Sequence, residues 1–282
     1  MIIDESYLRH RLLERKDESH KGDYGHLLVV AGCESMPGAA VLATGAALRS
    51  GCGLVTLHST PRALQAVVNN HPSAMLSEAG ESVFSRLPAD VGRYDAIVVG
   101  PGLGRAPETK EALLDLLLAA IGFQIPTVID ADALNILATI PQWEELLPKD
   151  AILTPHLGEL RRLLFWGNDA ERDEGIRALC ERTGITLIQK GFHTKVHTPA
   201  GGCLVNATGN PGLAKGGSGD VLAGLVGGLA ARGYAPVDAA ALGVWLHGLA
   251  GDLLAAERTP EAFHSRDLVD ALPLAFRRLY EA

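Results

Sequence analysis

The residues best suited to chemistry lie in one glycine-rich stretch, NATGNPGLAKGGSGD, which ends at Asp220. The apolar run that follows it, VLAGLVGGLAARG, predicts a helix. Glycines allow close backbone approach, and a helix start presents free N–H groups and a positive dipole end. Such a site suits a phosphoryl group in transfer, and Asp220 could take a proton from an attacking hydroxyl. The alternative is that Ser218 or Asp220 only caps the helix.

A second motif, QKGFHTK, follows the apolar residues 186–190. A lysine, backbone amides and a threonine hydroxyl at this spacing could hold nucleotide phosphates. The residues concerned are Lys190, Gly191, Phe192, His193 and Thr194. The alternative is an ordinary hairpin that leads into a strand around Val196, and the motif alone leaves both interpretations open.

Polar residues also follow two other apolar segments. His156, in LTPHLGE, comes directly after residues 151–154, where an α/β sheet binds its ligand, although a structural role is equally consistent with its position. In VIDADALN, Asp130, Asp132 and Asn135 could orient Mg²⁺ waters or substrate hydroxyls. Alternatively, Asp132 could be the N-cap of a helix with Asn135 three positions on.

Two small-residue segments offer space instead of polar side chains. GPGLG at 100–104 differs in spacing from a dinucleotide fingerprint, so we interpret it as a place where the backbone approaches a flat ring or a sugar. MPGAA at 36–40 would begin a helix without filling the crevice, or would pack closely on a sheet. The sequence has no GxSxG at a strand–helix junction and no GxxxxGK[ST] loop.

The motifs lie at the ends of segments that alternate between strand and helix patterns. Apolar segments, several of them continuous Val/Ile/Leu runs, predict buried parallel strands at 26–32, 54–58, 96–100, 126–130, 151–154, 186–190 and 202–206. Helical patterns lie at 39–50, 107–121, 158–165, 171–183, 218–231, 237–257 and 266–280. The alternation predicts an α/β fold with a mostly parallel central sheet and helices on both faces, in three layers. We expect one domain over residues 1–282, with the first 20 residues either a helix outside the sheet or partly mobile.

Composition argues against several classes of function. The chain has 282 residues, 47% of them hydrophobic, which is enough for a large core. A net charge of −8, few aromatics and no Lys/Arg block argue against nucleic acid. Four widely spaced cysteines without a CxxC pair argue against zinc and a disulfide framework. The N-terminus lacks an apolar signal core, and the longest apolar candidate, 221–231, is too short to span a membrane. We expect a cytoplasmic protein that does not bind membranes.

Together the motifs resemble the ribokinase-like superfamily, in which a glycine-rich turn ending in Asp forms an anion hole and supplies the base. Within it, the chain is similar to the ADP-dependent (S)-NAD(P)H-hydrate dehydratases. The resemblance extends from Lys21 to about Trp245. It is carried, in order, by KGDYGHLLVVAG, MPGAAVLA, ALRSGCGLV, VVGPGLG, VIDADALN, LTPHLGEL, QKGFHT and NATGNPGLAKGGSGD.

The resemblance implies site residues, with Asp220 as the catalytic one. The substrate-binding residues would be Ala40, Gly102, Asn135, His156 and Asp220. The nucleotide-binding residues would be Lys190, Gly191, Phe192, His193, Thr194, Asn210, Gly217, Ser218 and Gly219. Lys215 departs from the family pattern, because a small or hydroxylated residue is common there. This lysine could add a phosphate contact or point to solvent.

The resemblance also implies a reaction. ADP, or ATP in some members, phosphorylates the hydroxyl of hydrated NADH or NADPH (NADHX or NADPHX). Phosphate then leaves, which restores NAD(P)H and releases AMP when ADP is the donor. Mg²⁺ is inferred from phosphoryl transfer, with its ligands open. Many members carry an epimerase domain; this chain lacks room for one, so we expect a separate epimerase. We also expect a homo-oligomer, with a homotetramer as the candidate.

The sequence alone leaves two other functions open. The first is a ribokinase-like kinase of a small alcohol, of the thiazole or pyrimidine type, because the same anion hole and Asp220 would serve it. The second is a non-catalytic nucleotide-sensing protein that kept the fold. Retention of Asp220 and of the glycines disfavours the second.

Overall fold

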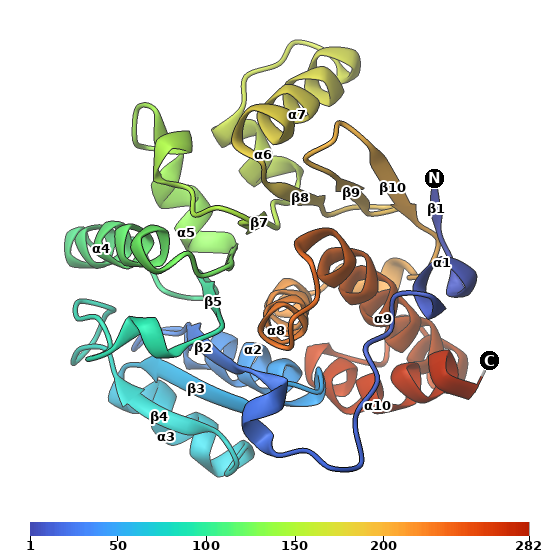
Figure 1. Ribbon diagram of the computed structural model, residues 1–282, viewed down its shortest axis with the longest axis horizontal. Coiled ribbons are helices and arrows are strands. Elements are labelled where there is room, and N and C mark those ends of the chain that lie inside the picture. The colour runs from blue at the N-terminus through green and yellow to red at the C-terminus, as the bar shows by residue number, and fades with distance from the viewer. Residues whose placement is uncertain (282) are drawn as a thin grey trace.

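The computed structural model describes residues 1–281, in which ten strands form one sheet flanked by helices (Figure 1). The strands are β1 (Ile2–Ile3), β2 (His26–Val30), β3 (Leu54–Ser59), β4 (Met75–Glu78), β5 (Ala96–Val99), β6 (Thr127–Ile129), β7 (Ile152–Leu153), β8 (Thr186–Gln189), β9 (Lys195–His197) and β10 (Cys203–Asn206). Their order across the sheet is β1-β10-β9-β8-β7-β6-β5-β2-β3-β4. Only β9 is antiparallel to its neighbours, so the predicted mostly parallel sheet is confirmed.

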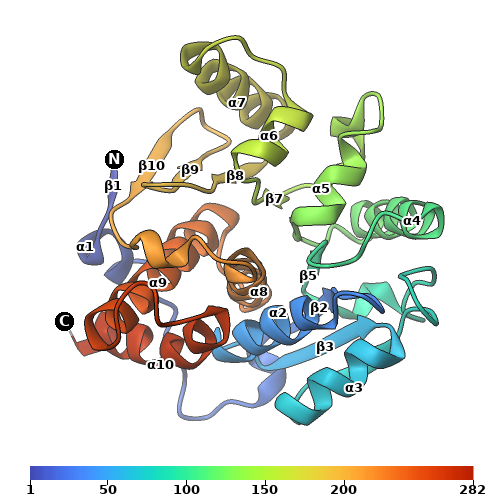
Figure 2. The same cartoon turned by 180° about the vertical axis from the view of Figure 1, so that it is seen from behind.

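Helices cover both faces of this sheet. They are α1 (Glu5–Arg9), α2 (Pro37–Arg49), α3 (Pro61–Asn70), α4 (Pro107–Phe123), α5 (Ala131–Leu137), α6 (Leu157–Leu163), α7 (Asp169–Thr183), α8 (Ser218–Ala231), α9 (Pro236–Glu257) and α10 (Ser265–Glu281). In β2, Leu27 and Val29 enter a core with α2, α8, α9 and α10, while Leu28 and Val30 enter a second core with α4 to α7. Both views show these two groups of helices on opposite sides of the sheet (Figure 1 and Figure 2). The three-layer prediction is therefore confirmed.

Each predicted strand and helix has a counterpart, but several short elements were missed. Strand β4, at an edge of the sheet, is largely exposed, so it has no continuous apolar run to reveal it. Helices α3 and α5 are short and begin directly after strand ends. The prediction for the first 20 residues was wrong in part: besides helix α1, the segment contributes β1, which pairs in parallel with β10 at the other edge.

The apolar helices α8 and α9 form the middle of one core. Helix α9 is long and apolar enough to cross a membrane, but 72% of that apolar window is buried within the protein, as in a core helix. The run 221–231 was thus not the longest candidate; it is buried in α8. Glycines there permit close packing, because a Cβ on Gly224 would lie 2.0 Å from the carbonyl oxygen of Ala43 in α2. The small residues of α8 therefore serve the interior of the chain.

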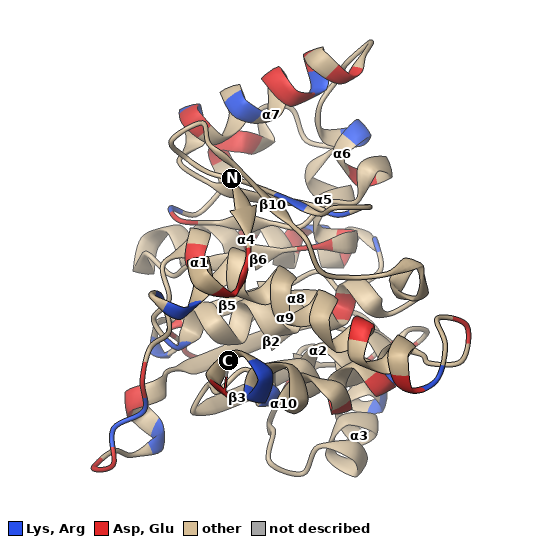
Figure 3. Cartoon of the chain, turned by 90° about the vertical axis from the view of Figure 1, so that its right-hand side faces the viewer, with Lys and Arg blue, Asp and Glu red and all other residues tan. Residues whose placement is uncertain are grey.

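Charged residues are dispersed over the outer elements. In a side view, Lys and Arg positions alternate with Asp and Glu positions, for example along α7 (Figure 3). This pattern agrees with the absence of a Lys/Arg block in the sequence.

Candidate active site

A cavity of about 760 Å³ opens beyond the carboxyl ends of β6, β7, β8 and β10, with α9 as its far wall. This is the size of an ordinary small-molecule site and the place where open α/β sheets bind ligands. Of the predicted site residues, it is lined by His156, Lys190, Gly191, Phe192, His193, Thr194, Asn210, Ser218, Gly219 and Asp220. Segments far apart in the sequence thus meet at one place.

The glycine-rich turn leads into α8 with its backbone donors free. Gly217 is the N-cap, with φ +88°, and no side chain caps the helix. The interpretation of Ser218 or Asp220 as a mere cap was therefore wrong. Within residues 1–281, the amides of Gly216, Gly217, Gly219 and Asp220 have no hydrogen-bond acceptor. Free amides at the positive end of a helix make a site for an anion.

A buried ion pair lies against the start of α8. Lys190 Nζ donates to Asp130 Oδ1 at 2.7 Å and lies 3.9 Å from Glu159 Oε2. The carboxylate of Asp130 is 1% exposed and also accepts from the hydroxyl of Thr154 at 2.7 Å. Gly219 permits this approach, since a Cβ there would lie 3.2 Å from Lys190 Nζ. Burial lowers the pKa of Lys190, but the neighbouring carboxylates outweigh burial and raise it. The group is therefore a permanent cation.

Asp220 projects into the same cavity and has an unusual acidity. Burial, and next the negative charge of Asp130, raise the pKa of Asp220 to about 6, although Lys190 opposes the change. A carboxyl group whose pKa is close to neutral both accepts and returns protons efficiently. The geometry therefore suits Asp220 to act as a general base beside an anion site.

His247 is a cavity residue that the sequence interpretation missed. It is buried in α9, and burial lowers the pKa of its imidazole to about 4, so the ring is neutral. Its Nε2 lies 3.0 Å from the backbone oxygen of Ser218, which can only accept, so Nε2 carries the proton. The ring thereby fixes the first residue of α8. A lone histidine in the otherwise apolar stretch 239–251 was the available signal.

The segment 190–194 both turns the chain and lines the cavity. It joins β8 to the antiparallel β9, so the hairpin interpretation describes its backbone. The hydroxyl of Thr194 donates to the carbonyl oxygen of Gly191 at 3.1 Å and closes the turn. Phe192, 90% exposed, contacts His193 with ring centroids 4.0 Å apart and ring planes inclined at 53°. The turn therefore presents its backbone and two aromatic rings at the cavity edge.

His156 has a structural role in addition to its place in the cavity wall. Its Nδ1 accepts from the amides of Gly158 at 2.9 Å and Glu159 at 3.2 Å, which caps α6. The carboxylate of Glu159 accepts in return from the His156 amide at 2.9 Å. The side chain of His156 is nevertheless 55% exposed, which leaves part of the ring accessible to a ligand.

The VIDADALN segment contradicts one of its two interpretations. The N-cap of α5 is Asp130, so the N-cap prediction for Asp132 was wrong. Asp132 instead accepts from the amide of Gly104 at 2.9 Å, which ties the GPGLG loop to this segment. Asn135 accepts from Arg162 at 3.0 Å and lies outside the cavity lining. The other interpretation, in which these residues orient Mg²⁺ waters or substrate hydroxyls, stays a prediction.

Three other predicted site residues also lie outside the cavity lining. Ala40 is fully buried in α2, and a Cβ on Gly32 would lie 2.8 Å from its methyl group. Gly102, with φ +60°, sits against the start of α2, where a Cβ would lie 2.6 Å from the methyl of Ala39. Gly217 supports the turn, since a Cβ there would lie 2.4 Å from a side-chain carbon of Leu42.

Asn210 and Lys215 also have structural partners. The side-chain amide of Asn210 donates to Asp252 at 2.9 Å, while its oxygen accepts from Gly212. The ammonium of Lys215 donates to three backbone carbonyls between α9 and α10. The prediction that Lys215 points to solvent was therefore wrong, because its ammonium binds backbone carbonyls, although the residue is among those that line the cavity.

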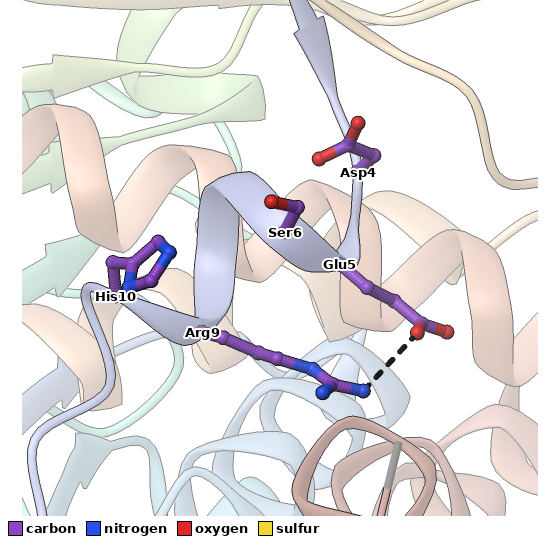
Figure 4. Close-up of a pocket in the computed structure, with 5 residues that line it drawn as sticks. All are labelled: Asp4, Glu5, Ser6, Arg9 and His10. Carbon is purple, nitrogen blue, oxygen red and sulfur yellow. Dashed lines mark ion pairs between the residues drawn. The ribbon is translucent and has the colours of Figure 1, made fainter.

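A second hollow lies on the surface of α1 and carries no comparable chemistry. It is lined by Asp4, Glu5, Ser6, Arg9 and His10, of which Arg9 and Glu5 form an ion pair at 3.5 Å (Figure 4). These side chains lie largely at the surface, where an ion pair contributes little. We therefore place the functional site at the larger cavity.

The fold and the site together define a ribokinase-like protein. A solved ribokinase-like superfamily protein from Enterococcus faecalis matches with a TM-score of 0.86 and 28% identity, over 98% of this chain and 95% of that one. More narrowly, the sequence profile of the NAD(P)H-hydrate dehydratases matches residues 27–274, and the chain belongs to that family.

Individual relatives carry the same family name. An ADP-dependent (S)-NAD(P)H-hydrate dehydratase from Neisseria meningitidis is 40% identical over 251 residues, covering 87% of this chain and 82% of that protein. The crystal structure of an ADP/ATP-dependent NAD(P)H-hydrate dehydratase from Bacillus subtilis, co-crystallised with ATP and Mg²⁺, matches with a TM-score of 0.83 and 31% identity, over 99% and 98% of the two chains. The chain spans about half the length of the bifunctional NAD(P)H-hydrate repair enzymes that it also matches.

Proposed function

We propose that this protein is a lyase that dehydrates the S-form of hydrated NADH and NADPH at the expense of ADP, releasing AMP and phosphate in a metabolite-repair reaction. Family membership and the name of the Neisseria meningitidis relative support the reaction. The observation that carries the proposal is local: the free amides at the start of α8 lie beside Asp220, in a cavity that also holds Lys190.

The reaction needs a base, an anion site and a leaving group. Asp220 takes the proton from the hydroxyl of the hydrated ring while the oxygen of that hydroxyl attacks the terminal phosphorus of ADP. Hydroxide is a poor leaving group, whereas phosphate is a good one. The carbon–oxygen bond to the new phosphate ester then breaks, and the neighbouring carbon loses a proton. This elimination restores the ring double bond. The pKa of Asp220, about 6, leaves it mostly ionised at neutral pH and ready for the first step.

The remaining residues hold the two substrates. The free amides of the turn would receive the transferring phosphoryl group, whose oxygens gain charge in the transition state. Residues 190–194 would hold the other phosphate and the nucleotide, together with Asn210, Ser218 and Gly219. Gly217 would contribute to nucleotide binding indirectly, through its positive φ, which shapes the turn. Because Asp132 binds the amide of Gly104, the GPGLG loop adjoins the cavity region, which supports a ring site near Gly102, Ala40, Asn135 and His156.

A magnesium ion fits this site only in company with phosphates. Within residues 1–281, no group of three or more His, Cys, Asp or Glu side chains is placed to hold a metal ion. Mg²⁺ typically uses one or two carboxylates together with substrate phosphates, and Asp220 and Glu159 lie at the cavity. When bound, the ion would neutralise charge on the phosphates.

We further propose that residues 1–282 act as one catalytic domain in the cytoplasm, as a homo-oligomer with the homotetramer as the candidate assembly. A separate epimerase would supply the S-form from its stereoisomer. Neither nucleic acid nor a membrane is proposed as a partner.

The decisive experiment is to incubate the purified protein with hydrated NADH, Mg²⁺ and either ADP or ATP, and to follow the return of NADH absorbance. We expect recovery with ADP, with AMP and phosphate appearing in equal amounts. Recovery with ATP alone would correct the donor. No recovery with either nucleotide, in a protein that still binds adenine nucleotide, would refute the dehydratase and favour a kinase of a small alcohol.

A further inference from the structure

Lys215 stands directly before the free amides of the glycine-rich turn, and its ammonium is fully engaged elsewhere. Its Nζ donates to the backbone oxygens of Pro260 at 2.7 Å and Glu261 at 3.1 Å, and to that of Phe263. The nitrogen also lies 4.4 Å from the centroid of the Phe263 ring. A lysine ammonium has three donors, so none is left for a ligand.

The partner of Lys215 is the connecting segment, residues 258–264, which joins α9 to α10. This segment is itself anchored, because Arg258 pairs with Asp267 of α10 at 2.9 Å and the Phe263 side chain is 1% exposed. A second link leads back to the turn, since the hydroxyl of Ser265 donates to the carbonyl oxygen of Gly216 at 2.6 Å. The turn is therefore held against the connecting segment and the start of α10 at two successive residues, Lys215 and Gly216.

The carbonyl oxygens that face Lys215 need a cation. Three carbonyl dipoles point their negative ends at one place, and a compact ammonium compensates them with charge-assisted hydrogen bonds. The free amides of Gly216 and Gly217 follow at once in the chain. Their directions depend on the backbone that Lys215 holds, and an anion site is effective only when its donors are aimed before the ligand arrives.

We propose that Lys215 is a positioning residue that acts as a built-in cation: it locks the glycine-rich turn onto the connecting segment and so keeps the anion site in shape. It touches neither the nucleotide nor the reacting atoms. The inference rests on the proposed function only in taking the anion to be a nucleotide phosphate.

The test uses Lys215→Ala in the full chain, with Lys149→Ala as the matched control, because Lys149 is exposed and its loss changes the net charge equally. Backbone hydrogen exchange is measured in the ligand-free protein at Ser218 and Val221, whose amides donate to the carbonyl oxygens of Lys215 and Gly217. Calorimetry then gives the Kd for ADP and for adenosine, which has no phosphate. Each measurement is repeated with ammonium chloride to replace the missing cation. Tetramethylammonium chloride is the control, because its cation is too large for the site and has no N–H donors.

In Lys215→Ala we expect faster exchange at Ser218 and Val221 and a Kd for ADP raised about tenfold, with the Kd for adenosine unchanged. The apparent KM for ADP should rise more than kcat falls. Ammonium should restore slow exchange and ADP affinity, whereas tetramethylammonium should not. A general loss of structure would not be repaired in this way.

Two outcomes would overturn the proposal. One is exchange and ADP affinity in Lys215→Ala equal to those of Lys149→Ala. The other is a parallel loss of ADP and adenosine affinity that ammonium does not repair. If the unaltered protein fails to dehydrate hydrated NADH while ammonium still restores slow exchange in Lys215→Ala, the proposed function fails and the role of Lys215 stands.

Discussion

Replacing Asp220 by asparagine removes one ionisable group and preserves its shape, so it separates the catalytic role of the residue from its effect on folding. The pKa of this carboxyl group is about 6 in the folded protein and 3.8 in a free chain, mainly because of burial and Asp130. The folded state therefore holds its proton more tightly, and stability falls as pH rises from about 4 to about 6. Above that range, the ionised group destabilises the fold by about 3 kcal/mol.

Asp220→Asn should consequently be more stable than the unaltered protein at pH 7, by up to about 3 kcal/mol, and no more stable below pH 4. Turnover of hydrated NADH should fall roughly a hundred- to ten-thousand-fold, because the base is lost. ADP binding should persist, since the amides of the turn are untouched. Urea unfolding at the two pH values and a single-turnover assay provide the measurements.

The exposed Asp115 gives a matched control, because Asp115→Asn should change neither stability nor turnover. A stability difference for Asp220→Asn that is absent at pH 7, or the same at both pH values, would refute the account of its electrostatics. Undiminished turnover would refute its role as the base.

Substitutions at Lys190, Gly217 and His156 test other parts of the site. Lys190→Met leaves the buried carboxylate of Asp130 without its cation and should lower the free energy of unfolding by about 3–5 kcal/mol; an unchanged urea midpoint would contradict the pair. Gly217→Ala places a side chain at φ +88° and should cost about 1–3 kcal/mol, whereas Gly191→Ala, where a Cβ meets nothing within 4 Å, should unfold as the unaltered protein does. His156→Ala should lose about 1 kcal/mol with the α6 cap, and His156→Asn should retain it. Equal substrate affinity in both His156 variants and the unaltered protein would exclude a substrate contact by the imidazole.

The fold was largely predictable because its sheet is buried on both faces. The internal parallel strands are rich in Val, Ile and Leu, and such segments differ visibly from the amphipathic or glycine-rich helices between them. Strand β4 escaped because one face of an edge strand meets solvent and needs no apolar pattern. Strand β1 has two residues and exists through its pairing with β10, which lies some 200 positions further along the chain.

The site was predictable in its parts and not in its contacts. The motifs predicted which residues could bind a phosphate, since glycines before an apolar helix imply free amides. They could not show that Lys190 pairs with Asp130, because the two lie 60 positions apart. The pKa of Asp220 likewise depends on burial and on charges from other parts of the chain, so the sequence alone could not predict it.

The sequence by itself determined the layered α/β fold, the cavity edge and Asp220 as the candidate base, because hydrophobic period and glycine spacing are local properties of the chain. Only the tertiary structure decided that His247 fixes Ser218, that Asp132 ties the GPGLG loop, and that Lys215 binds the connecting segment. Hydrogen bonds of polar side chains are set by whichever donors and acceptors folding brings within reach, and the order of residues along the chain does not contain that distance.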